Sequence, residues 1–493
     1  MCEPSVPEVV ERWPLAPDLS ISRVLIGLWQ IADMERGGEA IDLVETTTAM
    51  EPYVDAGFTT FDMADHYGSA ELIAGALMRR RNTDSVQLLT KWVPKPGPTS
   101  RADVRAAVEL ALDRMGGNRI DLLQFHSWNY ADPGYLDTLV HLQELKEEGL
   151  IRHLGLTNVD TPHLRIIIHS GIEVVSNQVC FSVLDQRARM SGMTDLCREH
   201  GITLLAFGTL AGGFLTERWL DEPEPDWEHL ETWSQMKYGR FIRAAGGWAA
   251  LQTLLRVLRA VATRHGVSMA NVACRYILDQ PAVGGVILGA RLGISEHRDD
   301  NLRLFELALD DASRAKIDAA VARLDPIPGD CGDEYRRAPF LTATGDLSHH
   351  IDDLPPPYEA RRGGDGRTRV LTGTVWEDLA GFSRAVRQGD RILVSGTTAT
   401  HGTRRIGGDD VEAQTHFVID KIEGALHSLG ARLEDVVRTR VYLNDEADWE
   451  PVSRVHGDRF RQIRPANTLV RAGIIGSGYL VEMEVEAWLT ADR

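Results

Sequence analysis

The sequence has few cysteines, no long apolar run and a deficit of positive charge. Its five cysteines are scattered, odd in number and form no Cys-x-x-Cys pair, which argues against a disulfide framework or a zinc site and favours a reducing cytoplasm. No apolar segment approaches the roughly 20 residues that cross a bilayer, so we expect no membrane partner. The formal charge of −19 leaves little basic surface for nucleic acid, so that partner is not expected either.

From residue 22 to 324, the sequence alternates short apolar runs with longer helical patterns. The runs are near-continuously apolar, as expected for strands that are covered on both faces. The predicted strands are residues 24–28, 59–62, 87–91, 121–126, 151–158, 173–178, 203–207 and 286–289. Eight strand–helix units predict an α/β domain, a closed (β/α)8 TIM barrel over residues 1–325. A doubly wound open sheet is the alternative, but no glycine-rich turn follows the first strand.

Residues 326–368 interrupt this pattern with proline, glycine and charged residues, and we interpret them as a connector between two domains. Two histidines and two aspartates within it could be called a metal cluster: His349, His350, Asp352 and Asp353. Nothing in the sequence fixes a coordination geometry for them, so a solvated connector is favoured and no metal site is predicted.

Residues 369–493 predict a smaller α+β domain of mainly antiparallel strands. Strand patterns occupy residues 370–375, 382–386, 391–396, 436–443 and 468–472, and helical patterns occupy residues 409–429 and 448–460. In the last segment, apolar Val481, Met483 and Val485 alternate with glutamates, which is typical of a half-buried strand.

Four polar residues end or follow three consecutive predicted strands of the barrel, namely Asp62, Tyr67, Lys91 and His126. The carboxyl ends of parallel strands open at one rim of a barrel, so we expect these side chains to meet there. Taken singly, each has a structural explanation: a helix cap, a pocket wall, a solvated strand end or a satisfied core histidine. Together they form an ionisable set, and a lysine that ends an apolar strand is rarely buried without a partner.

The segments that carry these residues, 61–68, 89–92 and 121–126, resemble the motifs of the aldo-keto reductases. Further segments agree with that family in the same order, namely 155–158, 177–178, 207–213, 287–291 and 296–301. The resemblance extends over most of the predicted barrel. It implies an NAD(P)H-dependent reduction of an aldehyde or ketone, or the reverse oxidation of an alcohol or sugar.

The resemblance assigns a catalytic role to each of the four residues. Tyr67 would donate a proton to the carbonyl oxygen, although a free phenol, with a pKa of about 10, is a weak acid at neutral pH. Lys91 would lower that pKa, and Asp62 would keep Lys91 in place and charged. His126 would donate a hydrogen bond to the same oxygen, and so orient it and stabilise its developing charge.

The implied cofactor lies extended over the barrel, with an aromatic ring beneath its nicotinamide and two amide side chains on its carboxamide. The cofactor-binding residues implied by the family are Thr157, Asn158, Gln178, Phe207, Gly208, Leu210, Gly212, Gly289, Ala290, Arg291, His297 and Asn301. A guanidinium suits a 2′-phosphate, so Arg291 favours NADPH (NADP) over NADH, although it could also be a surface charge near a helix. Leu288 and His297 depart from the proline and the arginine that are common in relatives.

The sequence says less about the substrate. Trp29, Trp92 and Trp128 lie at or just beyond strand ends and could line an aromatic pocket or simply pack. We expect an apolar or aromatic aldehyde or ketone, or an open-chain sugar, as the small-molecule partner. Residues 212–246 could cover the cofactor or form an ordinary structured excursion.

A second resemblance concerns the C-terminal domain. Segments 380–386, 392–396, 434–437, 464–468 and 481–484 resemble the Rid family, the YjgF-type reactive-intermediate deaminases, whose fold is like that of chorismate mutase. That family forms trimers with clefts between subunits, and its active members hydrolyse 2-imino acids. The corresponding cleft residues are Phe382, Asn467 and Glu482. Asn467 replaces the arginine that would hold a substrate carboxylate and Phe382 replaces a tyrosine, so standard deaminase activity is not expected.

Three functions remain open at this point. They are a reductase whose Rid-like domain assembles oligomers or binds a metabolite, a bifunctional reductase and imine-processing enzyme, and a non-catalytic NADPH sensor. The complete set of four polar residues favours the first, because a sensor requires neither Tyr67 nor His126.

The resemblance of the C-terminal domain to a trimeric family predicts the oligomeric state. We expect a homotrimer, or a multiple of three, assembled through that domain. Light scattering of the purified chain measures its molar mass directly. A mass that stays that of a monomer at every concentration would contradict this prediction.

Overall fold

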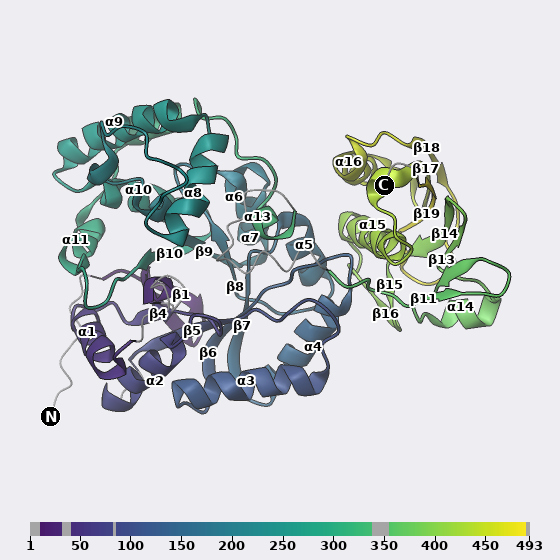
Figure 1. Ribbon diagram of the computed structural model, residues 1–493, viewed down its shortest axis with the longest axis horizontal. Helices are drawn as coiled ribbons and strands as arrows, with labels where there is room; N and C mark the ends of the chain where they lie inside the picture. Colours follow the sequence, from purple (N-terminus) through teal and green to yellow (C-terminus); the bar gives the residue numbers. More distant parts are fainter. Residues whose placement is uncertain (1–9, 32–40, 82–84, 338–353, 490–493) are drawn as a thin grey trace.

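The computed structural model describes residues 10–31, 41–81, 85–337 and 354–489. Figure 1 shows two bodies: a large one, purple to teal, in which helices surround a ring of strands, and a smaller one, green to yellow, in which a sheet carries helices on one side. The two bodies meet where α5 (Thr161–His169) packs against α15 (Val411–His427).

The larger body is a closed barrel of eight parallel strands, which confirms the predicted TIM barrel. The strands follow chain order around the ring, and the last pairs with the first. They are β3 (Val24–Gly27), β4 (Thr60–Asp62), β5 (Gln87–Trp92), β6 (Ile120–Phe125), β7 (Ile151–Thr157), β8 (Ser176–Cys180), β9 (Thr203–Phe207) and β10 (Val283–Gly289). Each overlaps one of the predicted strands.

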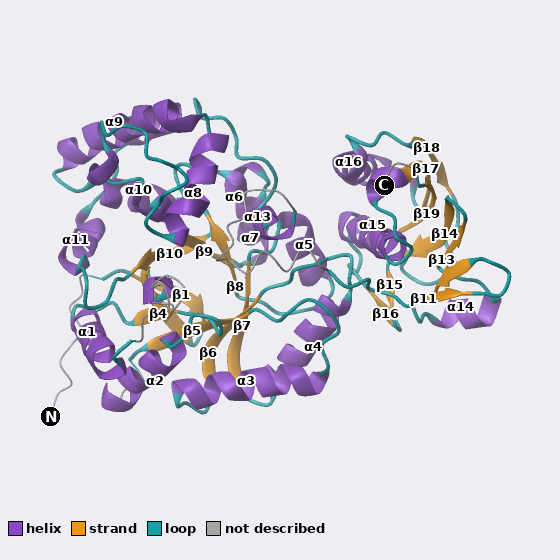
Figure 2. Cartoon of the chain, in the orientation of Figure 1, coloured by secondary structure: helices purple, strands orange, loops and turns teal. Residues whose placement is uncertain are grey.

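Helices connect these strands and cover the outside of the barrel, as the purple and orange elements of Figure 2 show. Their bounds are α1 (Leu43–Asp55), α2 (Ala70–Arg81), α3 (Arg101–Met115), α4 (Gly134–Glu147), α6 (Arg187–Met190), α7 (Met193–His200), α8 (Trp233–Ala244), α9 (Gly247–His265), α10 (Met269–Leu278), α11 (Arg298–Arg303) and α12 (Asp311–Val321). No helix among the described residues has the length and apolar character of a membrane span.

A hairpin that the sequence analysis did not predict closes one end of the barrel. Its strands are β1 (Arg12–Ala16) and β2 (Leu19–Ser22), and its apolar side chains form a small core with residues inside the barrel. That core contains Leu15, Ala16, Leu19, Ile21, Leu25, Leu89, Leu122 and Leu205. Trp13 donates a hydrogen bond to Thr203 at the start of β9, so the hairpin covers the amino ends of the strands. The carboxyl ends lie at the opposite mouth.

The segment expected to connect the domains contains secondary structure. A short helix, α13 (Asp333–Arg336), follows the barrel, and β11 (Ala360–Arg362) and β12 (Thr368–Val370) join the sheet of the second domain. The four residues weighed as a metal cluster, His349, His350, Asp352 and Asp353, lie outside the described residues. Within the described ranges, no group of three or more potential ligands is placed to hold a metal ion.

The C-terminal domain is α+β, as predicted, with a sheet ordered β11-β12-β13-β14-β19-β17-β18. The remaining strands of that sheet are β13 (Ala385–Gln388), β14 (Arg391–Thr398), β17 (Val436–Leu443), β18 (Ala466–Arg471) and β19 (Val481–Trp488). All neighbours are antiparallel except β17 and β18, which are parallel. The predicted alternation in the last strand is confirmed: Val481, Met483 and Val485 are buried on the face that α15 covers, and α16 (Trp449–Phe460) packs against α15.

The strand predicted for residues 370–375 is wrong over most of its length. The strand ends at Val370, and Val375 already begins the helix α14 (Val375–Ala380). The carboxylate of Glu377 accepts hydrogen bonds from the backbone amides of Thr372 and Gly373. These hydrogen bonds turn the chain out of the sheet, and a pattern of apolar residues does not predict them.

The packing of α2 against α3 predicts the effect of one substitution. A Cβ atom on Gly75 would lie 2.5 Å from the carbonyl oxygen of Met115, a backbone atom that cannot rotate away. We expect Gly75→Ala to lower the free energy of unfolding by about 1–3 kcal/mol, although alanine is the better helix former. Urea unfolding measures this difference.

Gly457 in α16 provides the matched control. The nearest atom to a Cβ added there is a side-chain nitrogen of Arg461, at 3.9 Å. Gly457→Ala should therefore be neutral or stabilise by up to about 1 kcal/mol. Equal destabilisation by the two substitutions would contradict the packing explanation.

Candidate active site

A buried ion pair lies at the carboxyl ends of β4 and β5. The ammonium of Lys91 donates to Asp62 Oδ2 over 2.7 Å and to the carbonyl oxygen of Met63 over 2.9 Å. Both charged side chains are only 5% exposed. The same ammonium lies 4.9 Å from the centroid of the Tyr67 ring. Three of the four predicted catalytic residues are therefore brought together by two neighbouring strands.

Two buried amides complete the surroundings of Asp62. Its Oδ1 accepts from Gln178 Nε2 at 2.7 Å and from Gln124 Nε2 at 3.3 Å. Both carboxylate oxygens thus have partners, which offsets part of the cost of removing the charge from water. Burial lowers the pKa of Lys91, and the Asp62 carboxylate opposes that shift. Gln178, predicted to bind the cofactor, also holds Asp62 in place through this hydrogen bond.

Tyr67 and His126 lie in an aromatic environment. The Tyr67 ring meets Trp29 edge-on at 4.9 Å between centroids, and the His126 ring meets Trp128 in the same way at 4.4 Å. Tyr335 of α13 packs edge-on against His126 at 5.8 Å. The mouth of the barrel is therefore walled mainly by rings at this point.

His126 is a buried, neutral imidazole. Its Nδ1 donates to the carbonyl oxygen of Thr157 over 3.3 Å, and its Nε2 is buried with no hydrogen-bond partner among the described residues. Burial, and next to it the positive charge of Arg336, holds the pKa of His126 well below its usual range. A neutral ring with an unused nitrogen is suited to hydrogen bonding with a ligand rather than to carrying charge.

One cavity of about 420 Å³ connects these residues to the predicted cofactor site. It is lined by all four predicted catalytic residues and by Trp29 and Trp128. The predicted cofactor residues that line it are Thr157, Asn158, Gln178, Phe207, Gly208, Leu210, Gly212, Gly289, Arg291, His297 and Asn301. Ala290 is buried beside it, and Trp92 packs against Phe125 outside it.

The groups that line the cavity suit a nicotinamide dinucleotide. Asn158 has a left-handed backbone, with φ 57°, and its buried Oδ1 has no partner in the described chain, so it offers an acceptor for a carboxamide N–H. At Gly208, φ is 69° and a Cβ would lie 2.2 Å from the hydroxyl oxygen of Tyr238, so a side chain there would clash with this neighbour in the cavity wall. Two guanidiniums, of Arg218 and Arg291, line the cavity and suit phosphate groups.

Several residues that line this cavity were not predicted from the sequence. Lys237 of α8 is buried, its ammonium donates to the Tyr335 hydroxyl, and it lies 4.0 Å from a Glu334 carboxylate oxygen. Arg218 and Ser234 also line the cavity, and both belong to residues 212–246, for which a cover over the cofactor was one of two predictions. This segment therefore forms part of the cavity wall. A single lysine or tyrosine in a helical pattern carries no signal that separates it from a surface residue.

The structure does not bring the three Rid-like cleft residues together within one chain. Asn467 accepts a hydrogen bond from Thr439, so it faces the helices. Glu482 alternates with buried Val481 and Met483, so it faces the other side of the sheet. The Phe382 ring lies 5.3 Å from the guanidinium of the buried Arg384.

The family comparison bears directly on the barrel. The sequence model of the Aldo/keto reductase family matches residues 23–322. The chain belongs to the aldo/keto reductase family. A second model, described as Endoribonuclease L-PSP, matches residues 375–489. Both resemblances found in the sequence are confirmed.

Individual relatives match one domain or the other. A YjgF-family protein of Mycobacterium tuberculosis is 43% identical over 25% of this chain and 99% of its own, with a TM-score of 0.23. The NADH-specific methylglyoxal reductase of Escherichia coli is 25% identical and covers 60% of this chain and 93% of its own length. A glycerol dehydrogenase of Gluconobacter oxydans, 20% identical, matches the fold with a TM-score of 0.54 over 66% of this chain and 98% of its own.

Membership of the reductase family establishes the kind of chemistry. This protein is an oxidoreductase of carbonyl or alcohol groups, and the family binds nicotinamide cofactors. The aldo/keto reductase barrel carries the cavity just described at the carboxyl ends of its strands.

The neutral state of His126 predicts a pH effect on stability. Below a pKa of about 6.5 the unfolded chain binds a proton at this residue and the folded chain does not, so folding becomes less favourable as the pH falls. At pH ~5.5 this difference amounts to about 1.4 kcal/mol. Between pH ~8 and ~5.5, urea unfolding should show the wild type losing about that much more stability than His126→Asn. An identical pH dependence would mean that the folded protein protonates this ring.

Proposed function

We propose that this aldo/keto reductase reduces an aldehyde or ketone with NADPH, or catalyses the reverse oxidation. The observation that carries the proposal is the buried Asp62–Lys91 ion pair beside Tyr67, at the open end of a cavity whose lining groups suit the cofactor. When bound, the cofactor supplies the hydride that reduces the carbonyl carbon. The protein must supply a proton and stabilise the oxygen.

Tyr67 is the proposed proton donor. A cation close to a phenol favours its phenolate form, which makes the phenol a stronger acid. Lys91 supplies that cation, and Asp62 keeps it fixed through the 2.7 Å hydrogen bond. Because the pair is buried, its field on Tyr67 is weakly screened by water.

His126 is proposed to bind the substrate oxygen. To donate, its proton must lie on Nε2, and in this tautomer Nδ1 no longer donates to the Thr157 carbonyl oxygen 3.3 Å away. The freed Nε2–H then has an acceptor in the substrate carbonyl. A neutral donor of this kind stabilises a developing negative charge without itself transferring the proton.

We propose that the cofactor is held by Asn158 at its carboxamide, by Phe207 beneath its nicotinamide, and by Arg218 and Arg291 at its phosphates. The first two line the cavity near His126, and both arginines line it as well. The preference for NADPH rests on the suitability of the Arg291 guanidinium for a 2′-phosphate. Trp29 and Trp128 then favour an apolar or aromatic carbonyl compound or an open-chain sugar.

The Rid-like domain is proposed to assemble trimers. Leu393, Val470 and Trp488 are 42–50% exposed and lie on the sheet face opposite α15, which no described element covers. These exposed apolar side chains are available to contact a neighbouring subunit. Because Asn467 and Glu482 face opposite sides of that sheet, a single chain does not assemble a deaminase site, and a metabolite-binding role is the alternative.

A reducing compartment such as the cytoplasm is also proposed. The described cysteines, Cys180, Cys197, Cys274 and Cys331, are buried free thiols. Burial raises the pKa of each of them, so they remain unreactive.

Tyr67→Phe tests the proposed function. Loss of the proton donor should lower the rate of carbonyl reduction by at least about 100-fold, while the affinity for NADPH is retained. The rate is measured by NADPH oxidation over a panel of aldehydes, ketones and lactols, with NADH in parallel. Fluorescence quenching measures cofactor binding.

Tyr135→Phe is the matched control. The Tyr135 hydroxyl is buried in α4 with no hydrogen-bond partner among the described residues, so its removal should leave the rate unchanged. An undiminished rate in Tyr67→Phe would reject the proposal.

A further inference from the structure

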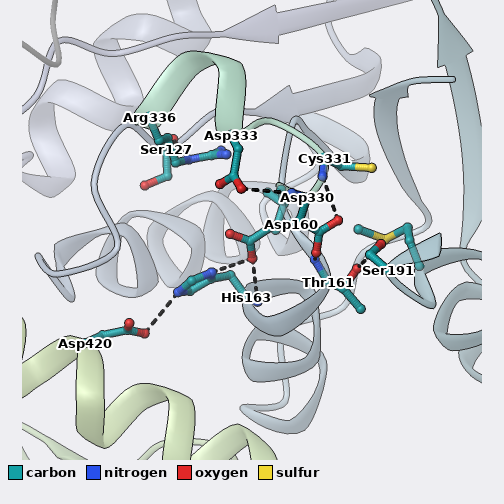
Figure 3. Close-up of polar contacts among 12 residues, drawn as sticks. Ser127, Asp160, Thr161, His163, Ser191, Asp330, Cys331, Asp333, Arg336 and Asp420 are labelled. Carbon is teal, nitrogen blue, oxygen red and sulfur yellow. Dashed lines mark hydrogen bonds and ion pairs between the residues drawn. The ribbon is translucent and has the colours of Figure 1, made fainter. Parts of the chain in front are cut away.

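A buried cation lies between the two domains. His163, in the first turn of α5, is 8% exposed, and its Nδ1 contacts Asp160 of the barrel. Its Nε2 contacts Asp420 Oδ2 of α15 at 3.0 Å. Asp420 also accepts from Arg459 of α16 at 2.6 Å. Figure 3 shows His163 between the carboxylate of its own domain and that of the other.

On the barrel side, this cation is joined to the loop that carries Asn158. Asp160 accepts a hydrogen bond from the backbone N–H of His163 at 2.9 Å and so caps α5. The N–H of Thr161 donates to Asp330 at 2.9 Å (Figure 3). A Cβ on Gly332 would lie 2.0 Å from the carbonyl oxygen of Asn158, so the chain after the barrel presses directly on this residue. The left-handed Asn158 is therefore held from two sides.

A stack of side chains joins the same cation to the substrate end of the cavity. The Tyr130 ring lies parallel to His163, with centroids 3.5 Å apart. The guanidinium of Arg336 lies over the same Tyr130 ring, 4.4 Å from its centroid. The Nε of Arg336 also donates a hydrogen bond to the carbonyl oxygen of Ser127 at 2.8 Å. Ser127 follows His126, and Arg336 follows Tyr335, which lines the cavity.

We infer that Asp420, from the second domain, is a positioning residue for the reductase site. It fixes His163, and through His163 it fixes the loop of Asn158 and the stack that supports His126 and Tyr335. The inference rests on the proposed function, because it assigns Asn158 to the cofactor. On this view the barrel does not complete its active site without the C-terminal domain.

The charges around His163 make this arrangement dependent on pH. Burial opposes its positive charge, but Asp160 and Asp420 raise the pKa of His163 to about 9. The other titratable or charged groups packed around it are Tyr130, Tyr135, Arg336, His416 and Arg459. Because the folded pKa lies above the usual value of about 6.5, the stabilisation is complete below that pH and is lost as the pH rises through 9.

Asp420→Asn tests the inference. This substitution replaces the carboxylate by an amide of the same shape, so it removes the negative charge that holds His163 without changing the packing. We therefore expect the KM for NADPH to rise by about tenfold and kcat to change by less than about twofold. The alkaline limit of kcat/KM should move down by at least about one pH unit, because His163 loses its proton earlier. Steady-state kinetics between pH ~6 and ~10 measure both effects, and circular dichroism confirms folding.

Asp137→Asn is the matched control. Asp137 of α4 is also a carboxylate of the domain interface, where it pairs with His401 and Arg404 of the hairpin β15 (Thr400–His401) and β16 (Arg404–Arg405). It is 41% exposed and does not line the cavity. Its loss should leave the KM for NADPH and the pH profile unchanged.

The outcomes separate the inference from the proposed function. A wild-type protein that reduces no carbonyl compound rejects the proposed function, and the dissociation constant for NADPH in the same variants then still tests the inference. Wild-type kinetics and NADPH affinity in Asp420→Asn overturn the inference, and so does an equal effect of Asp137→Asn. If Asp420→Asn does not fold, Asp420→Glu, which keeps the charge but displaces it, must raise the KM for NADPH by at least about twofold. An unchanged KM there overturns the inference too.

Discussion

The ion pair between Lys91 and Asp62 is the constraint on which the reductase site depends. An ammonium and a carboxylate, each 5% exposed, remain charged in the protein only if their geometry is close and their other hydrogen bonds are filled. The barrel fills them with the Met63 carbonyl and with two amides that come from β6 and β8. The ends of the four strands β4, β5, β6 and β8 must therefore lie at the same level along the barrel axis. The hydroxyl-bearing ring of Tyr67 then lies beside a fixed positive charge.

The closed barrel is what makes this possible. Parallel strands tied into a ring share one register, so residues at strand ends cannot shift independently. The hairpin β1–β2 covers the amino ends with apolar side chains, and the cavity lies at the other mouth. Polar and catalytic groups are thus confined to one end, while the opposite end contributes to stability.

The second domain is bound to this mouth by charge as well as by apolar packing. His163 and Arg459 face Asp160 and Asp420 in a buried layer between α5, α15 and α16. Each domain alone would keep one ion pair, His163–Asp160 in the barrel and Arg459–Asp420 in the second domain, but would expose it to water and lose the contact between His163 and Asp420. The two domains therefore share one network of charges around α5. Because α5 begins close to Asn158, the domain interface lies next to the proposed cofactor site.

Much of the fold could be predicted because local patterns of apolar and polar residues determine its helices and strands. Apolar runs and helical periodicity place eight strands in order, and a strand end predicts which rim a side chain joins, as for Lys91 and His126. The hairpin at residues 12–22 was not predicted because its few apolar residues are too short a run to show a strand pattern. The strand expected at residues 370–375 failed because Glu377 captures the backbone amides of Thr372 and Gly373.

The sequence by itself determined the barrel, the four polar residues at its rim and the two families. Only the tertiary structure decided that Gln178 orients Asp62, that Lys237 meets Tyr335 in the cavity, and that His163 contacts Asp420 across 257 positions of sequence. The reason is physical. Periodicity reports which face of an element is buried, whereas these contacts depend on ring closure and on how two domains dock, and no local pattern of residues encodes either.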